Sequence, residues 1–206
     1  MTSSKRAFDI ALALLGAIIF FVPGLLIAIA LLATQGRPIC YASERMKTPD
    51  DAFQLWKFRT MRGAIANDGV SGGDKAARIT RMGHVLRRTR LDELPQLWNV
   101  LRGDVSFVGP RPPLRQYVEL FPQLYARVLQ CRPGITGLAT LVYHAREERL
   151  LSACTTAVET DAVYVALCIP RKARLDLIYQ RKQTLMLDIS LLTKTVSRLF
   201  KRGSSA

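Results

Sequence analysis

The residues best suited to chemistry lie in one block, Leu86 to Pro113, which reads LRRTRLDELPQLWNVLRGDVSFVGPRPP. Two adjacent carboxylates, Asp92 and Glu93, follow several arginines, and a proline-flanked Arg111 comes near the end of the block. Metal-assisted chemistry on a phosphate ester needs acids of this kind next to guanidinium groups. The block therefore indicates an enzyme that acts on phosphates.

The two acids are expected at the start of a helix that runs from Asp92 to Leu101. Pro95 fits the first turn of this helix, and an apolar face follows from Leu94, Leu97, Trp98 and Leu101. Backbone N–H groups at a helix start favour negative charge and help to hold a phosphate. A plain N-cap is the alternative interpretation of such acids, and the nearby Arg88, Arg90 and Arg111 argue against it.

Arg111 lies between Pro110 and Pro112, so its backbone is nearly fixed. A rigid guanidinium suits bidentate capture of a phosphate better than a mobile lysine does. An exposed arginine in a surface turn is the alternative. Lys57 and Arg59, in a strand-like stretch near residues 52–61, are likewise either phosphate contacts or solvated edge charges.

An uncharged apolar run extends from Ile10 to Ala33, and as a helix it would be about 36 Å long, enough to cross a bilayer. Pro23-Gly24 interrupts its middle, and both flanks are positive, with Lys5 and Arg6 before the run and Arg37 and Arg45 after it. Since both flanks prefer the cytoplasm, a helix that enters and leaves on one face fits the pattern. A kinked single-pass helix remains open, because proline is tolerated in spanning helices.

The composition excludes several classes of protein. The chain has 206 residues, a net charge of +14 and 49% apolar residues, which fits one compact domain with an anchor and an anionic partner. Four scattered cysteines without a CxxC pair argue against a zinc site, and free buried thiols fit a reducing compartment.

The remaining segments read as a series of short elements. We expect a surface loop over 64–76, a basic helix over 78–88, an amphipathic helix over 117–130, and a tight turn over 132–137 before a short strand. A helix over 185–200 belongs either to the core or to the lipid head-group plane.

Several segments in this order resemble the bacterial sugar transferases, the small monotopic phosphoglycosyl transferases that begin glycan assembly on a polyprenol carrier. The similar segments are KRAFDI (5–10), WKFRTM (56–61), the block 78–112, RPGITGLA (132–139) and LDISLLTKT (187–195). The resemblance implies a mostly helical α+β fold, with a re-entrant helix-break-helix anchor over 1–36 and a compact catalytic part with amphipathic interfacial helices over 37–206.

The resemblance also implies an activity. Members of this family transfer a sugar-1-phosphate from a UDP-sugar to undecaprenyl phosphate with Mg²⁺ and release UMP, at the cytoplasmic face of the bacterial inner membrane. By this analogy Asp92 is the nucleophile that forms an aspartyl-phosphosugar intermediate, and Asp92 and Glu93 hold the metal, with Glu93 as positioning group or base.

Substrate binding is assigned by the same analogy. Arg111, held by Pro110 and Pro112, would bind the nucleotide diphosphate, and the weaker candidates for phosphate contacts are Lys57, Arg59 and Arg88. The sequence leaves open which sugar and glycan are involved, what Glu93 does, and whether the protein forms a homodimer.

The chain departs from the family pattern at several positions. Val22 replaces the usual serine before the proline, Ser43 replaces a common glutamine, a glycine is missing near Met46, and Thr140 replaces another glutamine. The similarity fades over 141–168, a stretch that is a candidate for sugar recognition.

Two non-enzymatic readings compete with this one. A membrane-associated scaffold would use the positive charge to hold lipids or proteins, but it needs no adjacent acids in basic surroundings. A membrane-tethered nucleic-acid binder lacks any recognition motif, and the cations do not form one stripe, so no nucleic-acid partner is expected.

Overall fold

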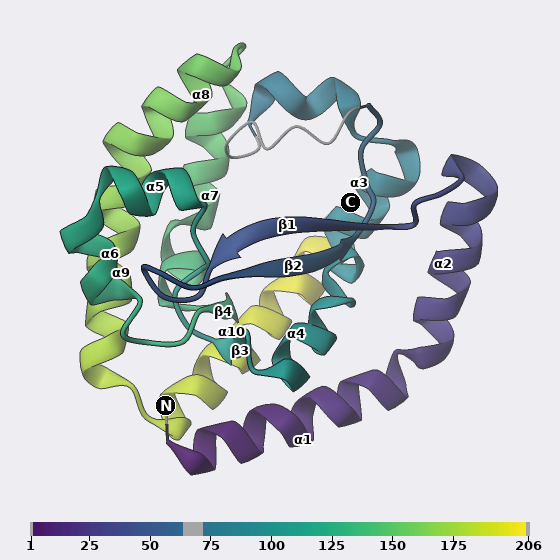
Figure 1. The fold of residues 1–206 in the computed structure, drawn as a ribbon. Coiled ribbons are helices and arrows are strands. Elements are labelled where there is room, and N and C mark those ends of the chain that lie inside the picture. The colour runs from purple at the N-terminus through teal and green to yellow at the C-terminus, as the bar shows by residue number, and fades with distance from the viewer. Residues whose placement is uncertain (1, 64–71, 205–206) are drawn as a thin grey trace.

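A computed structural model describes residues 2–63 and 72–204. Its helices are α1 (Ser3–Ile19), α2 (Phe21–Gln35), α3 (Arg81–Thr89), α4 (Gln96–Arg102), α5 (Arg115–Leu120), α6 (Pro122–Val128), α7 (Leu138–Ser152), α8 (Ala157–Val163), α9 (Ile169–Lys182) and α10 (Leu185–Ser204). The strands are β1 (Cys40–Met46), β2 (Ala52–Phe58), β3 (Ser106–Val108) and β4 (Gly134–Thr136). The expected mostly helical α+β class is confirmed (Figure 1).

Two small sheets organise the body of the protein. β1 and β2 form an antiparallel pair, whereas β3 and β4 are parallel, with Ser106 opposite Gly134. Gly109 and Gly134 allow the two chain segments to touch, because a Cβ atom on Gly134 would lie 2.1 Å from the backbone nitrogen of Gly109. The two motifs that contain these glycines, GPRP and RPGITG, are therefore in direct backbone contact.

The apolar N-terminal run is a bent helix pair. α1 ends at Ile19 because Pro23 has no N–H group to donate to the carbonyl of Ile19, and its ring clashes with that carbonyl. α2 continues at an angle of 60°, and Figure 1 shows the pair framing two sides of the body. Within the described residues no single helix meets the length and hydropathy needed to cross a membrane, but this pair does as a broken span or a re-entrant loop.

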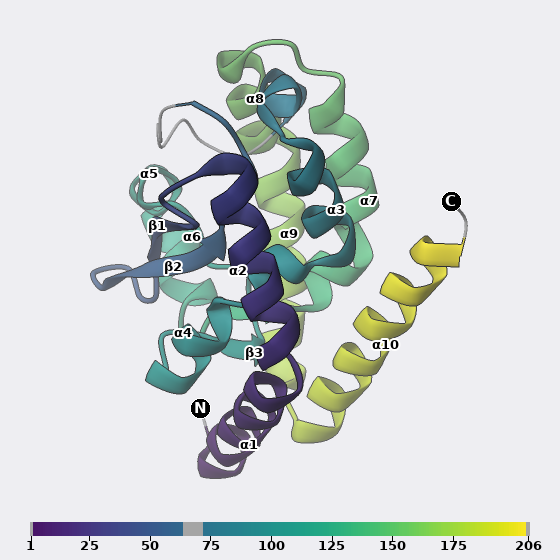
Figure 2. The ribbon, with the colours of Figure 1, turned by 90° about the vertical axis from the view of Figure 1, so that its right-hand side faces the viewer.

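Large apolar side chains cover the outer surface of the bent pair. The exposed ones include Leu14, Ile18, Ile19, Phe21, Val22, Leu25, Leu26, Ile29 and Leu32. α10, which Figure 2 shows diverging from the body, exposes Met186, Ile189 and Val196 while burying Asp188 and Leu191. One face of α10 therefore packs on the body, while the other presents apolar residues to the exterior. A place for α10 in the lipid head-group plane stays a prediction.

Polar side chains near the start of α1 dock it onto the body. Lys5 is 4% exposed, and its Nζ lies 2.6 Å from Asp188 Oδ2 and donates to the carbonyl of Val108 at 3.1 Å. Arg6 donates to the carbonyls of Val100 and Leu101 at 2.6 and 2.7 Å, which satisfies the end of α4. Both positive residues before the apolar run are therefore held by protein groups, a role that the sequence did not indicate.

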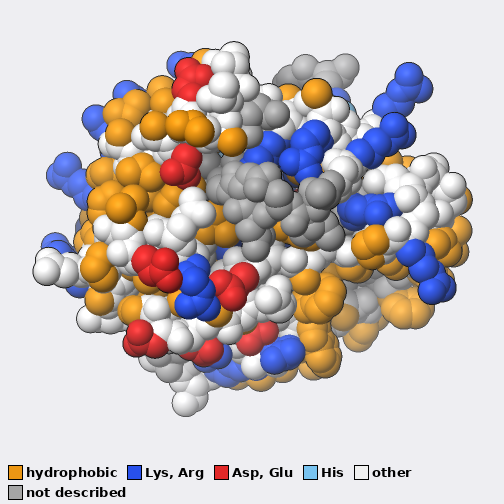
Figure 3. Space-filling view, turned by 45° about the horizontal axis from the view of Figure 1, so that its top comes forward, with side chains coloured by type: hydrophobic (Ala, Val, Ile, Leu, Met, Phe, Trp, Pro, Cys, Tyr) orange, Lys and Arg blue, Asp and Glu red, His pale blue; other side chains and the backbone are white. Residues whose placement is uncertain are grey.

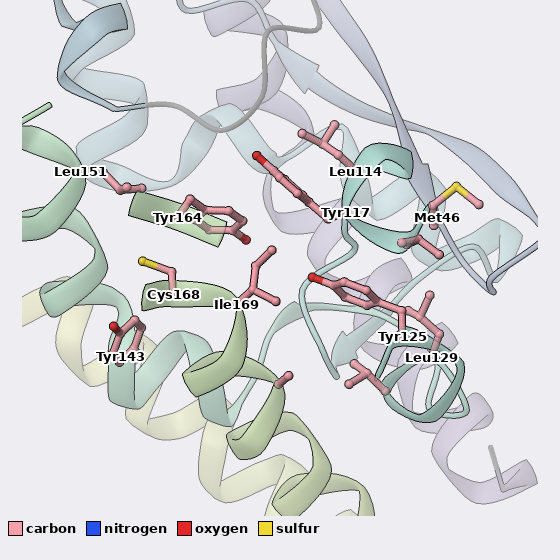
Figure 4. Close-up of a cluster of buried hydrophobic side chains, with 13 residues drawn as sticks. Met46, Leu114, Tyr117, Tyr125, Leu129, Tyr143, Leu151, Tyr164, Cys168 and Ile169 are labelled. Carbon is pink, nitrogen blue, oxygen red and sulfur yellow. The ribbon is translucent and has the colours of Figure 1, made fainter. Parts of the chain in front are cut away.

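The largest core cluster joins β1, α5, α6, α7 and α9. Its buried tyrosines are Tyr117, Tyr125, Tyr143 and Tyr164, packed with Met46, Leu114 and Ile169 (Figure 4). Tyr164 begins a short π-helical segment, η3 (Tyr164–Cys168), between α8 and α9. The four cysteines are free, and Cys131, Cys154 and Cys168 are buried as expected for small apolar residues.

Several expected elements differ from the structure. The helix expected over 117–130 is two helices, α5 and α6, divided at Phe121 by Pro122. The strand expected after Gly137 is the start of α7, and β4 lies within the predicted turn. The strand over 52–58 and the helices near 81–89 and 185–204 are confirmed. Most of the loop expected over 64–76 lies outside the described residues.

We predict that Asp188→Asn destabilises the fold by about 3–5 kcal/mol, because the change leaves the Lys5 ammonium buried without its counter-charge. Chemical unfolding in detergent or nanodiscs measures this loss. Asp51→Asn is the matched control, since the Asp51 carboxylate is mostly exposed and 3.9 Å from Lys47. Equal, small losses for the two variants would contradict a structural role for the buried pair.

Candidate active site

The two adjacent acids lie in a tight turn between two helices. α3 ends at Thr89, and its C-cap Arg90 adopts the left-handed conformation with φ 60°. A 3₁₀ turn, η2 (Leu91–Glu93), follows. α4 begins only at Gln96, with Pro95 as its N-cap. The expected helix start at Asp92 is therefore wrong, and the acids are positioned by a backbone reversal at Arg90 instead.

The expected apolar face of α4 is also corrected. Gln96, Asn99 and Val100 are the buried residues of α4, and Trp98 is 57% exposed. Asn99 bridges α4 to β2, because its Oδ1 accepts from the N–H of Trp56 at 3.1 Å and its Nδ2 donates to the carbonyl of Gln54 at 2.8 Å. The sequence did not reveal this role, since an amide among apolar residues reads as a solvent-facing position.

Glu93 is surrounded by cations from three different segments. Its Oε1 lies 2.7 Å from Lys57 Nζ of β2, 3.4 Å from Arg90 Nη1 and 3.9 Å from Arg111 Nη2. Burial raises the pKa of Glu93, but the charges of Lys57, Arg111 and Arg90 outweigh burial and hold that pKa at about 2. Glu93 is therefore ionised throughout the physiological range and fixes the three cations around it.

Asp92 has the opposite environment. It is 7% exposed, and its Oδ1 is enclosed and accepts no hydrogen bond within the described structure. Burial raises the pKa of Asp92, although the charge of Lys57 opposes the shift. The pKa values of these two neighbouring carboxyl groups are shifted in opposite directions. Such a pattern is typical of sites in which two acids have different roles.

Arg111 is presented by a rigid turn. Pro110 and Pro112 are buried on either side of it, and the carbonyl of Pro110 accepts from the N–H of Gly134 at 2.8 Å. The side chain of Arg111 remains 40% exposed and extends to Glu93. The structure therefore brings Arg111 and Lys57 together at Glu93, and their contact with a phosphate stays a prediction.

The other two predicted basic residues differ in setting. Arg59 donates to the carbonyls of Gln35, Gly36 and Arg37, so its guanidinium holds the end of α2. Arg88 is exposed on α3 at the wall of the pocket described next. A phosphate contact for either residue stays a prediction.

A pocket of about 670 Å³ opens in front of the acids. Its basic lining residues are Arg45, Lys57, Arg59, Lys75, Arg78, Arg87, Arg88, Arg90, Arg111 and Lys172, and its acidic ones are Asp92, Glu93, Glu147 and Glu148. Figure 3 shows Lys and Arg side chains gathered on this side of the molecule. A pocket with this excess of cations suits a ligand that carries several negative charges.

The stretch where the family pattern fades forms part of the pocket wall. His144 lies 3.1 Å from Arg90 through its Nε2, and Glu148 and Tyr164 line the same pocket. Glu147 pairs with the buried Lys172 at 2.8 Å. The placement of this stretch agrees with a role in sugar recognition, which stays a prediction.

Asp92 and Glu93 are the candidate ligands for a metal ion. Over residues 2–63 and 72–204, no cluster of three or more His, Cys, Asp or Glu side chains is arranged to hold an ion by itself. Mg²⁺ often uses one or two carboxylates together with substrate phosphates, and the unpartnered Oδ1 of Asp92 fits that mode. The donor set therefore fits a metal that arrives with a phosphate ligand.

Comparison with known proteins agrees with this geometry. The family model described as "Bacterial sugar transferase" matches residues 1–202. The chain belongs to the bacterial sugar transferase family. The motif that carries the acids and the motif that carries Arg111 are therefore those of a sugar transferase, which confirms the resemblance noted from the sequence.

Three relatives illustrate the range within the family. A UDP-galactose-lipid carrier transferase of Erwinia amylovora is 31% identical over 98% of this chain and 41% of its own length. A UDP-N-acetylgalactosamine-undecaprenyl-phosphate N-acetylgalactosaminephosphotransferase of Aeromonas hydrophila is 32% identical over 93% of the chain and 42% of its own length. A UDP-glucose:undecaprenyl-phosphate glucose-1-phosphate transferase of Caulobacter vibrioides is 34% identical over 95% and 69%. The chain spans about two fifths of the first two relatives.

We predict that Glu93→Gln lowers stability at neutral pH and that the difference from the wild type disappears in acid. The pKa of Glu93 is depressed from 4.5 to about 2, so its stabilising effect is complete above pH 4.5 and is lost as the pH falls towards 2. Unfolding midpoints measured at intervals between pH 7 and pH 2 test this expectation. Glu119→Gln, at an exposed carboxylate, is the control, and a pH-independent difference for Glu93→Gln would refute the prediction.

Proposed function

We propose that this protein transfers a sugar-1-phosphate from a UDP-sugar to undecaprenyl phosphate, with UMP as the second product. The observation that carries the proposal is the arrangement of Asp92, with an unpartnered oxygen, beside Glu93 and three cations in a basic pocket. Family membership and the activities named for the three relatives support the same reaction.

In the first step, the carboxylate of Asp92 attacks the phosphorus that is bonded to the sugar. The bond from this phosphorus to the bridging oxygen breaks, and UMP leaves with that oxygen and its electron pair. An aspartyl-phosphosugar intermediate remains on the protein. Arg111 binds the diphosphate, and Lys57 keeps Glu93 oriented beside it.

In the second step, a phosphate oxygen of undecaprenyl phosphate attacks the same phosphorus. The bond to Asp92 breaks, which regenerates the carboxylate and yields the lipid-linked diphosphosugar. Asp92 and Glu93 would hold Mg²⁺ together with the donor phosphates, and a bound Mg²⁺ would offset the negative charge that develops there. In this two-step route, the acceptor phosphate never has to attack the intact, negatively charged UDP-sugar. It attacks the smaller phosphosugar that is bonded to Asp92.

The bent helix pair supports a place for this reaction at the membrane. Residues 1–36 would act as a re-entrant anchor, and residues 37–206 as the catalytic part on the cytoplasmic face of the bacterial inner membrane. The exposed apolar residues of α1, α2 and α10 would contact lipid, so that the acceptor phosphate can reach the pocket. The lipid-linked product would then begin the assembly of a membrane-associated glycan.

We predict that Asp92→Ala or Asp92→Asn lowers UMP release by about three orders of magnitude or more, because the attacking group is lost. UMP release from a panel of UDP-sugars with undecaprenyl phosphate and Mg²⁺ measures this effect and identifies the donor. Asp161→Asn, outside the pocket, is a matched control.

Trapping the intermediate gives a second readout of the same proposal. The wild type, incubated with a donor labelled in the sugar-linked phosphate and without acceptor, should retain hydroxylamine-sensitive label, and Asp92→Asn should retain none. Turnover by Asp92→Asn at the wild-type rate would refute the mechanism. Absence of UMP from every donor, with the protein folded and membrane-bound, would favour the scaffold reading instead.

We also predict that Arg111→Lys lowers kcat/KM by about 10- to 100-fold, since lysine keeps the charge but loses the fork that grips two phosphate oxygens. Steady-state UMP release measures the change. The control is Arg102→Lys, at an arginine that is mostly exposed and lies outside the pocket. If Arg111→Lys and Arg102→Lys have the same kcat/KM, Arg111 does not bind the diphosphate in the proposed way.

A further inference from the structure

A second, smaller cavity lies beside the main pocket and is not used by the mechanism. Its volume is about 50 Å³, and residues from β1, the Pro-Arg-Pro turn and helices α5, α6 and α9 line it. The lining residues that matter here are Arg45, Tyr125, Tyr164, Ile169, Ala173 and Asp176. The two cavities share five lining residues, which are Arg45, Arg111, Leu114, Tyr164 and Lys172. The smaller one is therefore a side cavity next to the proposed diphosphate site.

The side cavity offers a hydrogen-bond donor that has no partner. Arg45 Nη1 is buried and makes no hydrogen bond within the described structure. Leaving such a donor unsatisfied is costly, which indicates that a ligand atom or a water completes it. Burial, together with the charge of Arg111, lowers the pKa of Arg45 to about 10, so the group remains cationic at neutral pH.

The remaining walls are a carboxyl group, an ammonium group, phenol rings and aliphatic side chains. The ammonium group is that of Lys172, which donates to Glu147 at 2.8 Å and to the hydroxyl of Tyr164 at 3.3 Å. Asp176 is 6% exposed on α9 and provides the carboxyl group, while Ile169 and Ala173 provide apolar contact. In Figure 4 the hydroxyl ends of Tyr125 and Tyr164 both point towards the space beside Ile169. A group that fits this lining needs an acceptor atom, a donor atom and a small apolar end.

Size and position limit the ligand further. A volume of about 50 Å³ holds about four atom-sized spheres, which excludes a uracil or sugar ring but admits a ring substituent. Arg111 lines both cavities and lies 3.9 Å from Glu93, the neighbour of Asp92. If Asp92 acts on the sugar-linked phosphorus as proposed, the side cavity is close to that phosphate. The substituent on C2 of the sugar is close to that phosphate, whereas the base lies beyond a second phosphate and a ribose.

We propose that the side cavity binds the C2 acetamido group of the donor, which makes this protein selective for UDP-N-acetylhexosamines over UDP-hexoses. The acetamido carbonyl would accept from Arg45 Nη1, its N–H would donate to Asp176, and its methyl group would pack on Ile169 and Ala173. A C2 hydroxyl would leave most of the cavity unfilled and Arg45 unsatisfied. This inference rests on the proposed function, because it assumes that Asp92 acts on the sugar-linked phosphorus.

The test compares donors that differ only at C2: UDP-N-acetylglucosamine with UDP-glucose, and UDP-N-acetylgalactosamine with UDP-galactose. We expect the acetylated member of at least one pair to have a kcat/KM for UMP release at least about tenfold higher. Arg45→Leu should reduce this ratio towards one, and Ala173→Val, which fills the cavity, should do the same by an independent route. Arg115→Leu, which removes an exposed arginine of α5, should leave the ratio unchanged.

Three results would overturn the inference. The first is a kcat/KM ratio near one in both pairs of donors. The second is a ratio that neither Arg45→Leu nor Ala173→Val changes. The third is that, in Arg45→Leu, inhibition by UMP becomes weaker to the same extent whichever donor is used. The last result would place the nucleotide, and not the sugar, in the cavity. Unfolding midpoints of both variants exclude loss of the fold as the cause.

Binding separates failure of this inference from failure of the proposed function. Calorimetric titration of Asp92→Asn with the same four nucleotides measures selectivity without turnover. Tighter binding of an acetylated donor, in the absence of UMP release by the wild type, would support the cavity assignment and refute the transferase reaction. Equal binding of all four, with UMP release intact, would refute only the cavity assignment.

Discussion

The ion pair between Lys57 and Glu93 connects the parts of the molecule that form the site. Lys57 belongs to the two-stranded sheet β1–β2, whereas Glu93 lies in the 3₁₀ turn between α3 and α4, and their charged atoms are 2.7 Å apart. With Arg111 attracted to the same carboxylate, three segments far apart in sequence converge on Glu93. The neighbouring Asp92 lies at the pocket wall with its Oδ1 left without a protein partner within the described structure, open to a ligand.

Contacts outside the site keep this charge network in place. Asn99 ties α4 to β2 and so fixes the distance between Lys57 and the turn that carries the acids. The close approach of Gly109 and Gly134 positions the turn that presents Arg111. Lys5 and Asp188 join the first helix to the last one, so the apolar bent pair is attached to the same body that holds the site.

The differences between expectation and structure share a physical cause. Periodicity predicted an apolar face on α4, yet Asn99 is buried there, since two backbone groups of β2 satisfy its amide. It predicted a helix start at Asp92, but Arg90 adopts a left-handed conformation that local propensity disfavours. It also read the segment after Gly137 as a strand, whereas α7 forms there and supplies a wall of the pocket. In each case contacts made by distant segments outweigh the local pattern.

The sequence by itself determined the break in the apolar run, the two adjacent acids and the rigid Arg111, because proline geometry and adjacent charges act over a few residues. The expected fold class came from the resemblance to the bacterial sugar transferases and not from the local pattern. Only the tertiary structure decided that Lys57, Arg90 and Arg111 surround Glu93 and that Lys5 is buried with Asp188. It also decided that Arg45, whose Nη1 has no partner within the described residues, lines a small cavity. These features depend on which segments contact each other in the folded protein. Those contacts decide how deeply a charged group is buried and which charges surround it, and so they decide its pKa.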